Sequence, residues 1–188
     1  MRVKKRWNQN SRERSLEQMA NAVSAVIWKA AAQVVLNLEN DNFETTTQAQ
    51  RVDLVEEVSS YLVHIADRWV YKRGSSEQRQ TFVGALVRDV SRLVEDSRFD
   101  VQGPGKYRAD FVERFNKRSS DYAEHHYTEE EGGSFRMRLT FGHHVANSMG
   151  AHDNKWIPDY IIGREAPEIE SGLTRALSGL VRLDSGSI

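Results

Sequence analysis

The sequence has no cysteine among its 188 residues. This absence excludes disulfides, zinc ribbons, iron–sulfur clusters and thiol nucleophiles. Prolines number only three, as expected for a helix-rich chain. Charge of one sign is also lacking, because 26 Lys and Arg stand against 27 Asp and Glu. This balance excludes a protein that binds polyanions over its whole surface and a disordered acidic chain.

A long uninterrupted apolar run is missing as well. The stretch 22–38 is apolar except for Ser24 and for Lys29, Gln33 and Asn37, which recur at steps of four. A membrane span needs about 18 consecutive apolar residues, and no small-residue cleavage site of a signal peptide is present. We therefore expect a cytoplasmic protein.

The residues 1–14 are basic, with six Arg and Lys against the single Glu13. We interpret them as a basic N-terminal arm. Chain termini are commonly solvated and partly ordered, which is the first interpretation of this arm. The alternative is that the arm contacts phosphate groups or an acidic membrane surface.

Apolar residues recur with helical spacing along almost the whole chain, and no stretch alternates with period two over a sustained length. The sequence therefore predicts an all-α, single-domain helical bundle of about six to seven helices with short connections. The bundle domain should span 15–184, followed by a tail at 185–188. The predicted helices cover 15–39, 48–73, 76–97, 107–127, 135–149, a short segment after Pro158, and a segment that begins at Pro167.

Local signals define several helix ends. Ser15, Ser76 and Ser134 are predicted N-caps, and Gly150 is expected to end the helix 135–149. The segment 156–161 is predicted to plug one end of the bundle, with Trp156 mostly buried. Helix 48–73 should bury one apolar stripe, which consists of Val52, Val55, Val58, Leu62, Ile65 and Trp69.

Histidine is the main candidate for chemistry. His64 shares the polar side of helix 48–73 with Glu57, which predicts a solvated face. Asp121 and His125 are one helical turn apart and could pair or share a metal. His126 follows the face of two aromatic residues and is interpreted as a packed histidine, or as one that interacts favourably with the C-terminus of the helix.

The later histidines do not complete a metal site in this interpretation. His143 is expected about two turns away from His125, too far for a shared metal. His152-Asp153 has the two residues of the dyad in metal-dependent HD phosphohydrolases, but it follows Gly150 in a predicted loop. No residue is therefore assigned a catalytic, cofactor-binding or metal-binding role.

Arginine pairs occur one turn apart on two predicted helices. Arg88 and Arg92 have Asp89 as a neighbour, and Arg114 and Arg118 also have acidic residues nearby. Interleaved opposite charges are typical of a solvated, salt-bridged helix face. We predict such a face on both helices.

Helix 15–39 carries a second apolar stripe besides the one that should face the core. It consists of Ala25, Trp28, Ala32, Val35 and Leu36. A helix packed on one side needs one stripe, so this helix is either the centre of the monomer or part of a subunit interface. We expect a twofold homodimer through the second stripe, with the central-helix arrangement as the alternative.

The sequence favours a non-catalytic interaction or regulatory module that self-associates, with no cofactor. The first alternative is a metal-dependent hydrolase or oxygen-handling bundle, with ligands from the set Asp121, His125, His143, His152 and Asp153. The second alternative is a nucleic-acid binder that works through the basic arm, whose affinity should fall steeply with salt.

Overall fold

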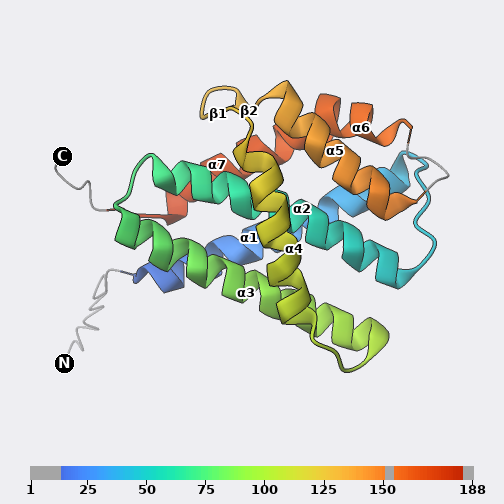
Figure 1. Cartoon of the computed structure of the whole chain (residues 1–188), viewed down its shortest axis with the longest axis horizontal. Helices are drawn as coiled ribbons and strands as arrows, with labels where there is room; N and C mark the ends of the chain where they lie inside the picture. Colours follow the sequence, from blue (N-terminus) through green and yellow to red (C-terminus); the bar gives the residue numbers. More distant parts are fainter. Residues whose placement is uncertain (1–13, 151–154, 184–188) are drawn as a thin grey trace, which may run out of the picture.

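The computed structural model describes residues 14–150 and 155–183. Its secondary structure in this part is almost entirely helical (Figure 1). Six long helices are α1 (Leu16–Asn40), α2 (Gln48–Tyr71), α3 (Ser76–Gln102), α4 (Tyr107–Ala123), α5 (Phe135–Met149) and α7 (Ala166–Leu180). Between α5 and α7 lie the four-residue α6 (Ile157–Tyr160) and a π-helical turn (Ile161–Glu165). The hairpin of β1 (Tyr127–Thr128) and β2 (Gly132–Gly133) joins α4 to α5.

One hydrophobic core is shared by all six long helices. This confirms the predicted all-α, single-domain bundle. Residues 1–13 of the predicted arm, the predicted tail 185–188 and the His152-Asp153 dipeptide lie outside the described residues.

Four of the long helices have a serine or threonine as their N-cap. Ser15, Thr47 and Ser134 accept a hydrogen bond from a backbone N–H in the first turn of α1, α2 and α5, as predicted for the two serines. The cap of α3 is Ser75 rather than the predicted Ser76, because Gln78 lies three residues after Ser75 and completes a reciprocal capping box with it.

Helix α2 is the central helix. Sixteen of its 24 residues are buried, and it contacts α1, α3, α4, α5 and α7. In Figure 1, α4 crosses in front of it. The predicted apolar stripe is buried. The prediction of a solvated polar face on this helix is wrong, because Glu56, Glu57 and His64 are buried beneath its neighbours.

Helix α1 lies at the side of the bundle. Nine of its 25 residues are buried, and its contacts are with α2, α3 and α7. By length and composition alone it is apolar enough to cross a membrane. Its main predicted stripe faces the core, with Val23, Ile27 and Ala31 fully buried.

Two helix ends differ from the prediction by four or more residues. Helix α3 continues to Gln102, five residues beyond Ser97, because Arg98 forms ion pairs with α2. Gly103, with a φ of 77°, is its C-cap. Helix α4 ends at Ala123 instead of Tyr127, and the chain forms the short hairpin. A Cβ on Gly133 would lie 2.7 Å from the Tyr61 hydroxyl, so glycine is needed where the hairpin meets α2.

The prediction that Trp156 is mostly buried is wrong. Its side chain is 60% exposed, and Lys155 Nζ lies 5.1 Å from the centre of the ring. Ile157 and Ile161 are instead fully buried at this end of the bundle. The helical register after residue 156 places these two residues, one turn apart, on the face that packs against α5.

The close packing of α5 on α6 gives a testable prediction. A Cβ on Gly142 would lie 2.8 Å from Pro158 Cα, so a side chain there forces the backbone of α6 to move. We expect Gly142→Ala to lower the free energy of unfolding by about 1–3 kcal/mol, measured by urea denaturation. The control is Gly84→Ala in α3, where a Cβ meets nothing within 4 Å. In the control, the free energy of unfolding should rise by up to about 1 kcal/mol. A rise in both variants would contradict the close packing of α5 on α6.

Candidate functional site

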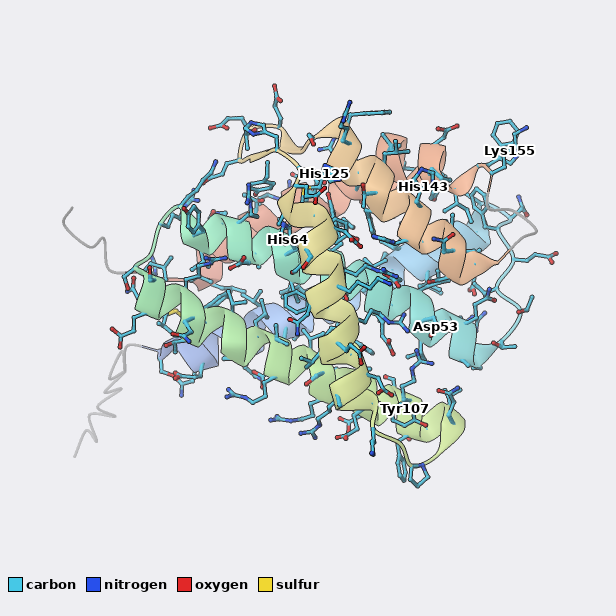
Figure 2. All side chains as sticks on the ribbon, in the orientation of Figure 1. Asp53, His64, Tyr107, His125, His143 and Lys155 are labelled. Atoms are coloured by element: carbon cyan, nitrogen blue, oxygen red, sulfur yellow. The ribbon has the colours of Figure 1, made fainter. Side chains whose placement is uncertain are left out.

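The ligands of the metal-dependent alternative do not converge in the described residues. His125 Nε2 lies 2.8 Å from Thr140 Oγ1, whereas His143 is exposed on α5 (Figure 2). Asp121 is near His144, with 3.1 Å between Oδ2 and Nε2, rather than near His125. Among the residues that the structure describes, no group of three His, Asp or Glu side chains could hold a metal ion. His126 is exposed, so the first interpretation, that of a packed histidine, is wrong.

The strongest charged cluster lies where α4 crosses α2. Arg118 binds the carboxylate of Glu57 through two hydrogen bonds, each of 2.7 Å, and Arg114 Nη1 lies 3.3 Å from the same carboxylate. Glu57 is 1% exposed. The prediction of a solvated face at Arg114 and Arg118 is therefore wrong, because both side chains turn inward to a carboxylate on another helix.

A second buried carboxylate lies beside the first. Glu56 is 3% exposed, and Arg98 Nε donates a hydrogen bond of 2.6 Å to its Oε1. Arg98 also binds Asp53, and Arg114 Nε lies 3.4 Å from Glu56 Oε2. Burial raises the pKa of Glu56, and the hydrogen bond from Arg98 opposes this shift. The cluster of Glu56 and Glu57 with Arg98, Arg114 and Arg118 thus joins α2, α3 and α4.

His64 lies in the same region as a neutral ring. Burial lowers its pKa to about 4. Its Nδ1 is 3.4 Å from Ser119 Oγ, and its Nε2 has no hydrogen-bond partner among the described residues. A serine nucleophile needs a base that is oriented by a third group. The nearby carboxylate of Asp67 is instead bound by Arg79, at 2.6 and 2.7 Å. This arrangement is that of a packed histidine.

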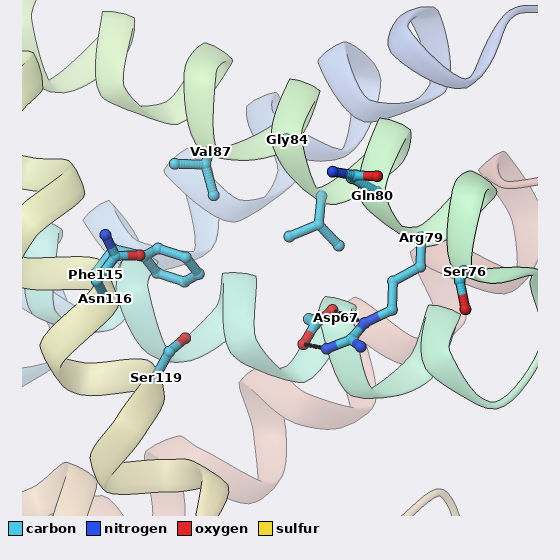
Figure 3. Close-up of a pocket in the computed structure, with 10 residues that line it drawn as sticks. Asp67, Ser76, Arg79, Gln80, Gly84, Val87, Phe115, Asn116 and Ser119 are labelled. Carbon is cyan, nitrogen blue, oxygen red and sulfur yellow. Dashed lines mark hydrogen bonds and ion pairs between the residues drawn. The ribbon is translucent and has the colours of Figure 1, made fainter.

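An open cleft of about 580 Å³ lies between α2, α3 and α4 (Figure 3). The Asp67–Arg79 ion pair forms one wall, and Phe115, Asn116 and Ser119 of α4 form another. The two charges of the pair are bound to each other, so the cleft presents mainly neutral polar atoms and apolar surface. It can accept a ligand, but it brings together no acid, base and nucleophile.

A third buried carboxylate holds the hairpin in place. Glu170 on α7 is 3% exposed. It accepts hydrogen bonds from Gly133 N at 3.1 Å, from Arg138 Nη2 at 2.7 Å and from the hydroxyl of Tyr61. Burial raises the pKa of Tyr61 well above its usual value, and the neighbouring charge of Glu170 adds to this shift. The phenol therefore stays protonated and donates a hydrogen bond to Glu170.

A fourth buried carboxylate, Glu165, lies between α1 and α7. It is 1% exposed and ends the π-helical turn. Asn37 Nδ2 donates to both carboxylate oxygens, at 3.1 and 3.2 Å. The Tyr160 hydroxyl lies 3.0 Å from Glu165 Oε1 and 2.6 Å from Asp41 Oδ2, so the two carboxylates share its one proton. π-Helical turns occur often at functional sites, and a groove of about 340 Å³ adjoins this carboxylate.

The residues of the proposed subunit interface are divided between surface and core. Ala25 and Leu36 are exposed, Trp28 and Ala32 are half-buried, and Val35 is buried. Val35 therefore belongs to the core of the monomer.

Sequence reasoning missed the buried carboxylates because it treated each helix by itself. The clustering of charged residues on two helices is a signal that could have predicted the ion pairs between them. Helix α2 carries Asp53, Glu56 and Glu57 within five positions, and α4 carries Arg114 and Arg118 one turn apart. Acidic residues clustered on one helix and arginines one turn apart on another indicate pairing across the bundle.

Comparison of the chain with protein-family models, with curated proteins and with solved structures finds no match.

Proposed function

We propose that this chain is a cytoplasmic, non-catalytic interaction module that self-associates through the exposed face of α1. The observation that carries the proposal is the position of α1 in the bundle. The apolar second stripe of this helix required either a central position or a partner, and the central position is held by α2. The face of α1 that carries Ala25 and Leu36 is left without a covering helix.

The exposed face lies between two flanks that are already occupied. On one flank, Asn21 donates a hydrogen bond to Asp89 of α3. On the other flank, Asn37 donates to Glu165, next to α7. The surface between them carries Leu36, which is 52% exposed, together with Ala25 and the half-buried Trp28 and Ala32. The exposed Lys29 and Gln33 form a polar edge on the same side.

The order of small and large residues suits a twofold antiparallel pair of α1 helices. In such a pair with its axis between residues 30 and 31, Ala25 lies opposite Leu36 of the second copy, and Trp28 lies within one residue of the position opposite Ala32. Each large side chain then meets a small one, which lets two helices approach to about 8–10 Å. A helix of this length, about 37 Å, can supply much of the roughly 800 Å² per partner in a standard interface.

The cytoplasmic location rests on the same helix. Its core-facing residues are buried against α2, α3 and α7, which favours a core helix of a globular domain over a membrane span. The nucleic-acid alternative depends on residues outside the described part and stays a prediction.

A size swap tests the proposed pairing. Ala25→Leu and Leu36→Ala should each weaken self-association at least tenfold, because they create a large–large or a small–small contact. The double variant restores large-against-small contacts and should recover the dimer. The measurement is the molar mass by light scattering after size exclusion, at tens of micromolar.

The control for this experiment is Phe135→Ala, which removes an exposed aromatic ring on α5, away from α1. It should leave the mass unchanged. A wild-type chain that is monomeric at these concentrations would contradict the proposal, as would a dimer that neither single variant weakens.

A further inference from the structure

Glu165 differs from the other buried glutamates in the described part of the chain. Glu57, Glu56 and Glu170 each have a guanidinium nitrogen within 2.7 Å. The cation nearest to Glu165 is Arg164, with Nε 4.0 Å from Oε1. Arg164 is itself exposed and bound to Asp41. Glu165 thus has neutral hydrogen-bond donors but no directly bonded cation among the described residues.

A carboxylate in this environment is costly. Burial of a charge is unfavourable by several kcal/mol unless a partner charge and hydrogen bonds offset it. The hydrogen bonds from Asn37, together with the Tyr160 hydroxyl that Glu165 shares with Asp41, offset part of this cost. A positively charged group beside the carboxylate would offset the rest.

The groove beside Glu165 has room for such a group. It runs between α1 and α7, which are antiparallel: Asn37 meets Glu165 at one end, and Arg182 N lies 3.3 Å from Met19 Sδ at the other. Its volume of about 340 Å³ lies within the range of small-molecule sites. Most of its lining is apolar, from Ala30, Val34, Leu62, Ile169 and Leu173, with Gly172 on the wall.

The other charges of the groove are at its rim. Lys29 and Glu168 are exposed, and Arg175 Nη1 is bonded to Ser171 Oγ at 2.8 Å. Lys29 precedes Asn37 by eight residues, or about 12 Å along α1. Arg175 follows Glu165 by ten residues, or about 15 Å of helix. Neither cation is therefore placed to neutralise Glu165.

We infer that this groove binds a small molecule with a primary ammonium group on an unbranched apolar chain. The ammonium donates hydrogen bonds to the Glu165 carboxylate, which retains acceptor positions beyond those used by Asn37 and Tyr160. The chain lies over Ala30, Val34 and Leu173. A chain of about eight carbons spans roughly 10 Å, which is shorter than the distance from Glu165 to the rim cations estimated from the helix rise.

Calorimetric titration of the full chain with octylamine tests this inference, and octanoate is the control of equal length and opposite charge. We expect octylamine to bind at least tenfold more tightly. Glu165→Gln, which keeps the shape of the side chain, should weaken octylamine binding at least tenfold. Glu168→Gln removes an exposed carboxylate at the rim of the same groove and should weaken it less than threefold.

A second variant keeps the test valid if Glu165→Gln does not fold. A Cβ on Gly172 would meet nothing within 4 Å, so Gly172→Leu should fill the groove without lowering the melting temperature. It should abolish octylamine binding. Equal binding of octylamine and octanoate, or octylamine binding that persists in a folded Glu165→Gln or Gly172→Leu variant, would overturn the inference. The molar mass of the chain is a separate readout, so the result does not depend on self-association.

Discussion

Replacement of Arg98 by methionine is expected to lower the free energy of unfolding by about 3 kcal/mol, at the lower end of the range for broken buried ion pairs. Methionine keeps much of the side-chain volume but removes the hydrogen bond of 2.6 Å to Glu56 Oε1. Glu56 would then be a buried carboxylate whose nearest guanidinium is Arg114, at 3.4 Å. Asp53 is partly exposed and can be hydrated instead.

Two further variants identify the cause of this loss. The surface pair Arg108–Glu95 has side chains that are 47% and 34% exposed, so Arg108→Met should lose less than about 1 kcal/mol. The double variant Arg98→Met with Glu56→Met should be more stable than Arg98→Met alone, because no uncompensated charge remains. Urea denaturation at pH 7.5 measures all three variants. If Arg98→Met lowers the free energy of unfolding no more than Arg108→Met does, the buried cluster contributes no more to stability than a surface ion pair.

The same variant should respond to pH in a defined direction. Burial already raises the pKa of Glu56 above 4.5 in the folded chain, and loss of Arg98 raises it further. The folded state then binds a proton at a higher pH than the unfolded state does. The destabilisation of Arg98→Met should therefore shrink as the pH falls toward 4.5.

The second large effect concerns His64. Its pKa is lowered from 6.5 to about 4, mainly by burial; Arg68 and Arg79 add to this shift and Asp67 opposes it. The unfolded chain takes up a proton near pH 6.5, whereas the folded chain does not until about pH 4. Stability from this residue is thus complete above pH 6.5 and is lost as the pH falls from 6.5 to 4.

We expect the wild-type chain to lose about 2 kcal/mol of stability through His64 between pH 7.5 and pH 5. His64→Gln removes the titrating group, so the stability of this variant should fall by about 2 kcal/mol less than that of the wild type over the same pH interval. Urea denaturation at the two pH values measures the difference. Equal pH dependence in the wild type and in His64→Gln would mean that the ring is accessible to protons in the folded state.

The helices could be predicted from the sequence because their signals are local. The N-caps Ser15 and Ser134 and the bounds of α5 follow from residues within one turn of each helix end. The apolar stripe of α2 follows from spacing alone. The extra length of α3 could not be predicted this way, because Arg98 is held by carboxylates that precede it by 42 and 45 residues.

The candidate sites were harder to predict for the same reason. A polar helix face next to solvent and a polar face next to a complementary charged helix have the same one-dimensional pattern. The sequence pattern therefore places His64 and Glu57 at a solvated face, although α4 covers them with Ser119 and Arg118. The large apolar side chain of Trp156 predicts a core position, although the helical register gives that position to Ile157.

Site-directed cross-linking tests the proposed self-association most directly, because the chain has no native cysteine. In the antiparallel pair, Ala25 lies opposite Leu36 of the second copy, whereas residue 25 of one copy is about 16 Å along the helix from residue 25 of the other. The Ala25→Cys/Leu36→Cys variant should therefore give a covalent dimer with a short bismaleimide, and each single variant should not. Dimer formation by the single variants would contradict the antiparallel pairing, and dimer formation by none of the three would contradict an α1 interface.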